Sequence, residues 1–363
     1  MKKILCLIDT LGFGGAERQM IGLALFLKKK GYRVDLITYH DHDFYSELMD
    51  NYGLGTKILT TGNNKWSKLL SVRRHIHKVG GYDWVIAYKD GPAVIGCLLK
   101  MIGEKFHLIV SERNTTQTIK TRERVKFFLY KWADFIVPNS FAQSIFIQKN
   151  FPHLSDKVVT ITNFTDADHF VPNFTFFNER LLIMTVARIA KQKNLLKYLE
   201  VVQLFKKNGY AGKVHFEWYG NLQSGEETYG EECRKKRVEL GVEEMIDIHP
   251  ATTDIVKHYQ SCDIFCLPSL YEGFPNVVCE AMSCGKPIAC SNICDNPHIV
   301  QENKNGVLFD PHNEVSMYKR LKRMVDMMQK DREEWGRTSR KIAEKLFSKE
   351  SFVQKYIDLI EGK

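Results

Sequence analysis

The sequence of 363 residues contains no long apolar run. A membrane-spanning helix needs about 20 such residues in succession, and no stretch of this chain approaches that length. The first apolar segment, Ile4–Ile8, follows Lys2 and Lys3 and stops at Asp9, which makes it too short for the core of a signal peptide. We interpret it as a first strand and expect a cytoplasmic protein.

Cysteine occurs nine times, but no two cysteines have the spacing C-x-x-C. That spacing is typical of zinc sites and redox-active pairs, so the sequence predicts neither. An odd number of scattered cysteines also gives no disulfide framework. Reduced thiols in a cytoplasmic protein are the expectation, and neither a metal nor a cofactor is expected.

The glycine fingerprint of dinucleotide-binding proteins is also missing. It needs the spacing G-x-G-x-x-G, and the run Gly12–Glu17 lacks the third glycine. A nicotinamide cofactor, and with it a dehydrogenase, is therefore disfavoured. The run does connect a strand, Lys3–Ile8, to an amphipathic helix, Ala16–Lys30, and Arg33–Tyr39 is predicted to be the next strand. Such a βαβ unit requires a parallel sheet.

Positive charge is concentrated in the first half of the chain. Met1–Asn163 holds 24 Lys and Arg against 14 Asp and Glu, a net charge of +10, whereas the remainder holds 28 against 29. Two stretches combine basic with apolar and aromatic residues, Lys65–Val79 and Ile119–Trp132. The asymmetry predicts an anionic partner: a membrane surface, a nucleic acid or a phosphorylated substrate. The alternative is two surface helices whose apolar faces pack into the domain.

Two glutamates eight positions apart follow an apolar strand, Asp263–Leu267. Glu272 lies in a loop and Glu280 in the short helix after it. Pro275 suits the first helical position, and Gly285 suits the left-handed residue just past the helix end. The helix start offers free backbone N–H groups and the positive end of the dipole, which together bind anions.

This stretch could hold a sugar nucleotide. Glu272 would contact sugar hydroxyls, the N–H groups a phosphate, and Glu280 a ribose. The other interpretation is an ordinary strand–loop–helix unit with two exposed glutamates. A chain of this length suits two domains, and the strand and helix pattern restarts at Leu181.

The pattern resembles the retaining glycosyltransferases of family four, the glycosyl transferases group 1. The resemblance rests on Glu272-x7-Glu280 and on two further elements in the family's order. Gly14-Gly15-Ala16-Glu17-Arg18 matches the family's glycine loop. Ala187-Arg188-x4-Lys193-Asn194 matches its G-R-x4-K-G, with alanine and asparagine in place of the two glycines.

The resemblance implies an α/β protein of the GT-B fold, with two Rossmann-like domains facing across a cleft. The acceptor-side domain is expected at residues 1–170 with a returning helix at 350–363, and the nucleotide-sugar-binding domain at 171–349. The linker is expected at 171–180. The implied activity is a retaining, metal-independent transfer of a hexose-type sugar from a nucleotide sugar, with a UDP-sugar expected. The implied acceptor is a glycan or a lipid-linked molecule in surface polysaccharide, lipopolysaccharide or glycoconjugate biosynthesis.

The resemblance also assigns residues. Arg188, Lys193 and Glu272 are the catalytic candidates, the first two on the diphosphate. The donor-binding candidates are Gly14, Gly15, Gly273, Phe274, Pro275, Asn276, Val277 and Glu280. The acceptor-side candidates are Glu17, Arg113 and Asn114, where Arg113 and Asn114 stand near the place of a histidine found in many family members.

Other readings of the sequence stay open. A sugar-nucleotide epimerase of the same fold, or a non-catalytic subunit that binds a sugar nucleotide, would share these motifs. A nucleic-acid binder would explain the basic half but not the pair of glutamates, so no nucleic-acid partner is expected. The basic stretches make an anionic membrane surface a candidate partner, with the protein peripheral on the inner face of the cell membrane. Asp41-His42-Asp43 has the form of a D-x-D metal motif, but an exposed loop is the preferred interpretation.

Overall fold

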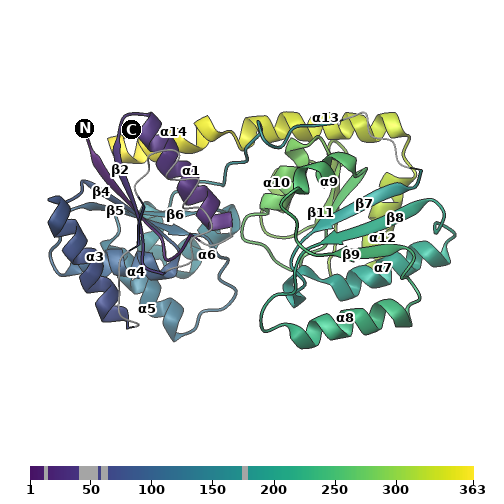
Figure 1. Cartoon of the computed structure of the whole chain (residues 1–363), viewed down its shortest axis with the longest axis horizontal. Helices are drawn as coiled ribbons and strands as arrows, with labels where there is room; N and C mark the ends of the chain where they lie inside the picture. The colour runs from purple at the N-terminus through teal and green to yellow at the C-terminus, as the bar shows by residue number, and fades with distance from the viewer. Residues whose placement is uncertain (12–14, 41–55, 59–63, 174–178) are drawn as a thin grey trace. The chain divides into compact units, whose positions relative to one another are not determined.

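The computed structural model describes the chain except residues 12–14, 41–55, 59–63 and 174–178 (Figure 1). It contains two compact units. Unit 1 comprises Met1–Phe164 together with Glu350–Lys363, and unit 2 comprises Thr165–Lys349. The first crossing between the units thus follows residue 164, where the sequence predicted it after residue 170. Asp41, His42 and Asp43 lie outside the described residues.

Unit 1 is built on a six-stranded parallel sheet with the order β3-β2-β1-β4-β5-β6. Its strands are β1 Lys3–Leu7, β2 Arg33–Thr38, β3 Thr56–Ile58, β4 Trp84–Tyr88, β5 His107–Glu112 and β6 Phe135–Pro138. Its helices are α1 Gly15–Lys29, α3 Lys65–Val79, α4 Asp90–Met101, α5 Thr121–Leu129, α6 Phe141–Asn150 and α14 Lys349–Glu361.

Helices cover both faces of this sheet. Side chains of α1 and α14 share one apolar cluster with β1 and β4, and side chains of α3, α4 and α5 share a second one. All five residues of β4, Trp84–Tyr88, are buried, as expected for a central strand with helices on both sides. The returning helix α14 therefore completes the core of unit 1.

One apolar stretch of unit 1, Val158–Ile161, forms only part of a strand. Val158–Ile161 runs beside β6, where Val159 and Ile161 donate to the carbonyls of Ile136 and Pro138 over 2.9 and 3.1 Å, but only an isolated bridge joins Ile136 and Val158. Pro138 has no N–H to donate in return, which prevents a regular ladder. The unpredicted β3 forms the opposite edge of the sheet.

Unit 2 repeats the plan with the strand order β12-β11-β10-β7-β8-β9, again all parallel. Its strands are β7 Leu181–Val186, β8 Val214–Tyr219, β9 Ile246–His249, β10 Ile264–Leu267, β11 Ile288–Ser291 and β12 Gly306–Phe309. Its helices are α7 Leu195–Lys207, α8 Glu227–Glu239, α9 Ile255–Ser261, α10 Asn276–Ser283, α11 Asn296–Ile299, α12 Glu314–Val325 and α13 Gln329–Leu346. α9, α10 and α13 lie on one side of the sheet, and α7, α8 and α12 on the other (Figure 1).

Each sheet has one point where the strand order reverses direction. In unit 1 the reversal falls between β1 and β4, and in unit 2 between β7 and β10. Open parallel sheets bind ligands at the carboxyl ends of the strands at such points. In the described part of the chain, no helix is both long enough and apolar enough to cross a membrane.

Candidate active site

A lysine–glutamate pair joins the two loops that flank the reversal point of unit 2. Lys193 ends the short 3₁₀ turn after β7, and its Nζ atom lies 2.5 Å from Oε1 of Glu272 in the loop after β10. Gln192 ties the same loops together twice, because its carbonyl accepts from the N–H of Leu270 and its side chain donates to the carbonyl of Tyr271, each over 2.8 Å. Glu272 is buried.

Asn194 stands where the resemblance expects the second glycine of G-R-x4-K-G. Its backbone is left-handed, with φ of +66°, a conformation that glycine adopts readily and asparagine tolerates. Its buried side chain donates to the carbonyls of Pro268 and Pro311 over 3.1 and 2.8 Å. The substitution therefore keeps the turn and adds two hydrogen bonds that anchor the start of α7.

Arg188 differs from Lys193 in that it is exposed. Its guanidinium makes no hydrogen bond or ion pair within the described residues. The carbonyl of the preceding Ala187 accepts from the indole N–H of Trp218 over 2.7 Å, which fixes the backbone from which Arg188 projects. The side chain therefore remains available to an anionic ligand.

The start of α10 provides backbone donors beside Glu272. The N–H groups of Gly273, Phe274 and Val277 have no acceptor in the part of the chain that the structure describes. Such groups at a helix start bind phosphate well. Pro275 precedes the helix instead of starting it, since its ψ of 73° is not helical and α10 begins at Asn276.

The ring of Phe274 is buried against Phe347, with the ring centroids 5.7 Å apart. Phe274 can thus offer a ligand its backbone, while its side chain belongs to the core. Gly285 has φ of +72° just past the end of α10, as the sequence predicted.

Glu280 projects from α10 and is also buried. Its Oε2 atom accepts a hydrogen bond from the hydroxyl of Tyr259 over 3.0 Å. The interpretation of Glu272 and Glu280 as two exposed glutamates is therefore wrong. Tyr259 was not singled out from the sequence, because nothing in a helix as short as the seven-residue α9 indicates which residue faces α10.

In unit 1, Glu17 lies in the first turn of α1 and is buried. Its Oε1 atom lies 2.5 Å from Nζ of Lys89, which also lies 3.0 Å from Oδ1 of Asp9. Burial alone would lower the pKa of Lys89, but the hydrogen bonds to Glu17 and Asp9 outweigh it and raise the pKa above its usual value. Gly15 is the first residue of α1, and Gly14 lies outside the described residues.

Lys89 has an unusual backbone, with φ of 71° and ψ of 168° at the N-terminus of α4. This region is almost restricted to glycine and costs about 1–3 kcal/mol for other residues, and such residues cluster at functional sites. Asp9 and Lys89 directly follow the apolar stretches Ile4–Ile8 and Trp84–Tyr88. The rule that ligands bind at carboxyl ends of parallel strands could have identified both residues.

Arg113 is turned into unit 1. Its Nη1 atom donates to Oδ1 of Asn163 over 2.6 Å, Nη2 lies 3.4 Å from the hydroxyl of Tyr356 in α14, and the guanidinium lies 3.8 Å from the ring centroid of Tyr88. These contacts fasten α14 to the sheet. They explain the presence of Arg113 at this position without any contact to an acceptor substrate. The neighbouring Asn114 is exposed.

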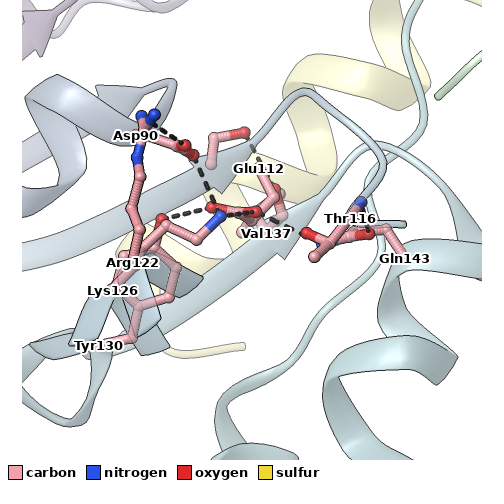
Figure 2. Close-up of polar contacts among 9 residues, drawn as sticks. Asp90, Glu112, Thr116, Arg122, Lys126, Tyr130, Val137 and Gln143 are labelled. Atoms are coloured by element: carbon pink, nitrogen blue, oxygen red, sulfur yellow. Dashed lines mark hydrogen bonds and ion pairs between the residues drawn. The ribbon is translucent and has the colours of Figure 1, made fainter. Parts of the chain in front are cut away.

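A second charged network lies at the end of β5 (Figure 2). Nζ of Lys126 lies between Glu112 and Asp90, 2.8 and 3.1 Å from their carboxylates. Tyr130 donates a further hydrogen bond to Glu112. Burial raises the pKa of Glu112, although Lys126 opposes the rise. Lys126 therefore belongs to the interior, and the basic stretch Ile119–Trp132 presents only part of its charge to solvent.

Two units, each an open parallel sheet with helices on both faces, have the architecture of the GT-B fold. Residues 167–342, most of unit 2, match the family model of the glycosyl transferases group 1. Unit 2 belongs to this family, which confirms the resemblance that the motifs predicted. The chain is a glycosyltransferase.

Two curated relatives and one solved structure extend the comparison over the whole chain. An uncharacterized glycosyltransferase of Haemophilus influenzae is 27% identical over 337 residues, which cover 90% of this chain and 91% of the relative. The N-acetylgalactosamine-N,N'-diacetylbacillosaminyl-diphospho-undecaprenol 4-alpha-N-acetylgalactosaminyltransferase of Campylobacter jejuni is 24% identical over 344 residues, with 90% and 91% coverage. The structure of Anabaena HepE in complex with UDP has a TM-score of 0.86 and 18% identity, with 100% of both chains covered. This likeness shows the fold.

Proposed function

We propose that this glycosyltransferase transfers a hexose-type sugar from a UDP-sugar to a glycan or lipid-linked acceptor, with retention at the anomeric carbon and without a metal ion. The observation that carries the proposal is the Lys193–Glu272 pair beside the N–H groups of Gly273, Phe274 and Val277, which have no acceptor among the described residues. It places a cation and backbone N–H groups, which suit a diphosphate, next to a carboxylate, which suits sugar hydroxyls. A nucleotide sugar needs both kinds of contact at one site.

The proposed mechanism follows from the charge that develops on the leaving group. Breaking the bond between the sugar and the phosphate puts negative charge on the departing diphosphate. Arg188, Lys193 and the start of α10 stabilise that charge where it forms, which is the effect of an oxyanion hole. Because these groups supply positive charge, the transfer needs no metal ion.

Retention is proposed to proceed without a protein nucleophile. Retaining glycosidases place a nucleophilic carboxylate about 5 Å from a second carboxyl group. Here Glu272 is bound by Lys193, and Glu280 is bound by Tyr259 inside the domain. Glu272 orients the donor sugar and Glu280 holds the ribose, while the acceptor attacks the face from which the diphosphate departs and the departing phosphate accepts its proton.

The comparisons support the proposed substrates. The name of the Campylobacter jejuni relative describes transfer to a sugar on diphospho-undecaprenol, and the Anabaena structure contains UDP. A membrane-bound acceptor also suits the surface of unit 1. α3 exposes Trp66 and Leu70, by 70% and 45%, and α5 exposes Val125 and Phe128, by 54% and 55%.

α3 and α5 each lie beside α4 on one face of the sheet, so their outer sides belong to the same face of unit 1. Exposed basic residues accompany the apolar ones: Arg74 on α3 and Arg124 on α5. Apolar and aromatic side chains among cations are the composition of surfaces that lie on anionic membranes. We propose that this face meets the inner surface of the cell membrane.

The test is an assay of nucleoside diphosphate release. The protein is incubated with the UDP derivatives of glucose, galactose, N-acetylglucosamine and N-acetylgalactosamine. The acceptors are the methyl α-glycosides of these sugars and the same sugars on a lipid diphosphate. Release of UDP with a disaccharide product, undiminished by EDTA, supports the proposal, and NMR of the product reports the anomeric configuration.

Two outcomes would replace the proposal. UDP binding without release would indicate a non-catalytic subunit. Conversion of the donor sugar without an acceptor would indicate an epimerase.

A further inference from the structure

Unit 1 has a charged cluster in the place that corresponds to the candidate active site of unit 2. In unit 2, Lys193 and Glu272 come from the loops after β7 and β10, the two strands at the reversal point. In unit 1, Asp9 and Lys89 follow β1 and β4, the two strands at its own reversal point, and lie 3.0 Å apart. Both pairs therefore occupy the ligand-binding edge of a parallel sheet.

The charges in this cluster do not balance. One ammonium group, that of Lys89, faces the carboxylates of Glu17 and Asp9, which leaves one negative charge. Glu17 is buried, while 31% of the Asp9 side chain is exposed. The Oδ1 atom of Asp9 accepts from Lys89 and from the N–H of Thr10, and Oδ2 has no hydrogen-bond partner among the described residues.

The excess negative charge of the cluster determines which kind of ligand can bind there. An excess negative charge repels a phosphate or diphosphate, and a carboxylate oxygen with free lone pairs accepts hydrogen bonds from hydroxyl groups. The cluster thus fits the neutral, hydroxyl-rich part of a substrate. In a transferase whose donor is bound by unit 2, that part is the acceptor sugar.

We infer that Asp9 is an acceptor-binding residue, whose Oδ2 atom accepts a hydrogen bond from a hydroxyl of the acceptor sugar. The inference rests on the proposed transferase function. Lys89 is a positioning residue: it holds Asp9 in place and neutralises Glu17 behind it.

Asp90 provides a matched control one residue from Lys89. Its side chain is 33% exposed, and its carboxylate is paired with Lys126, 3.1 Å away, and with Arg122, 3.5 Å away. It points to the network of Glu112, as Figure 2 shows. Asp9→Asn and Asp90→Asn thus remove equal charge from carboxylates of similar exposure at the same edge of the sheet.

The experiment compares steady-state kinetics of wild type, Asp9→Asn and Asp90→Asn with the donor and acceptor panel described above. Loss of a hydrogen bond to a charged group is expected to raise the acceptor KM about 10- to 100-fold in Asp9→Asn. The donor KM and the slow hydrolysis of the UDP-sugar by water should stay within about twofold of wild type. Asp90→Asn should leave the acceptor KM unchanged.

Asp9→Glu is the second variant, which keeps the charge and displaces it by one methylene. It should raise the acceptor KM less than Asp9→Asn does. Lys89→Met should raise the acceptor KM and leave the donor KM unchanged. A general loss of folding would not change one KM without the other.

The inference is overturned if folded Asp9→Asn or Asp9→Glu retains the wild-type acceptor KM, or if the donor KM changes instead. If the wild-type protein releases no UDP with any donor and acceptor, the proposed function itself fails. The two failures are thus distinguishable.

Discussion

Nζ of Lys193 and Oε1 of Glu272 lie 2.5 Å apart although 79 positions separate the residues in the sequence. The pair fixes the direction of both groups before any ligand binds. A preorganised cation stabilises developing charge without having to reorient during the reaction. Lys193 is therefore expected to contribute more to turnover than an equally charged but mobile lysine on the same turn.

Replacement of Lys193 tests this expectation. Lys193→Ala should lower turnover by about 10²–10³, the usual loss when one charge-stabilising donor is removed, and Arg188→Ala should have an effect of the same order. Lys191→Ala is the control, because Lys191 lies on the same turn and is exposed. Near-normal turnover of Lys193→Ala or Arg188→Ala would remove that residue from the mechanism.

The two glutamates should differ in what they bind. Glu280→Ala is expected to weaken binding of free UDP, because its proposed partner is the ribose. Glu272→Ala should impair transfer and leave UDP affinity nearly unchanged. Tyr259→Phe removes the hydroxyl that holds Glu280 and should weaken UDP by a smaller factor than Glu280→Ala. Calorimetry with UDP measures all three, and the reverse order for the two glutamates would exchange their roles.

Membrane binding should depend on the exposed residues of α3 and α5. Wild-type protein is expected to sediment with anionic vesicles at low salt and to be released at high salt, because salt screens the attraction. Arg74→Glu with Arg124→Glu should reduce binding at least about tenfold, since each basic residue near such a surface contributes about 1 kcal/mol. Arg234→Glu, an exposed arginine on α8 in unit 2, is the control. Lack of sedimentation by the wild type would favour a soluble acceptor.

Lys126 should matter for folding and not for membrane binding. Its side chain is buried between two carboxylates, and removing one partner of a buried pair costs about 3–5 kcal/mol. Lys126→Met should therefore be strongly destabilised at pH 7.5. Exposed Lys131→Met is the control and should change the free energy of unfolding by less than about 1 kcal/mol.

The pH dependence of this loss follows from Glu112. Burial raises its pKa in the folded protein, and removal of Lys126 raises the pKa further. A carboxyl group whose pKa is higher in the folded than in the unfolded protein destabilises the fold as the pH rises. The reason is that the unfolded chain, in which the group is exposed to water, ionises it at a lower pH. The deficit of Lys126→Met should thus be larger at pH 7.5 than at pH 4.5. Thermal unfolding at both values measures it, and an equal deficit would contradict the role of Glu112.

Cys294 offers a chemical test of the donor site. The other eight cysteines are buried, whereas Cys294 is partly exposed. Burial raises the pKa of its thiol, and a backbone hydrogen bond with Glu272 opposes the rise. Only the thiolate reacts, so alkylation by N-ethylmaleimide should be slow at pH 7 and faster as the pH increases. Modification should inactivate the enzyme and UDP should protect it, with Cys294→Ser as the insensitive control. Full activity after complete modification would place Cys294 away from the donor.

The sequence predicted strands well where a buried strand is also a distinct pattern of apolar residues that ends at polar ones. β4, β6 and β7 coincide with short, mainly apolar runs that polar residues or turns bound, and β8 and β9 alternate apolar with polar residues. The three-residue β3 is too short to give such a pattern. The partial strand Val158–Ile161 has the right composition, but its pairing depends on the missing N–H of Pro138, which is a property of the neighbouring segment.

Only those residues of the candidate site that belong to recognisable sequence motifs could be named from the sequence. Arg188, Lys193 and Glu272 lie in the loops after β7 and β10, and Glu280 lies in α10. The sequence does not contain the register that pairs Lys193 with Glu272 or Glu280 with Tyr259. The sequence also could not show that the guanidinium of Arg113 makes its contacts inside unit 1, because its partner Tyr356 is 243 positions away.

Helix α14 gives the chain an unusual order of assembly. Tyr356, whose hydroxyl lies 3.0 Å from that of Tyr88, belongs to the core of unit 1, but the ribosome adds it after all of unit 2. During synthesis, unit 2 can fold as soon as its own residues have emerged, whereas unit 1 must wait with one face of its sheet incompletely covered. The first half of the protein is therefore the last to be finished.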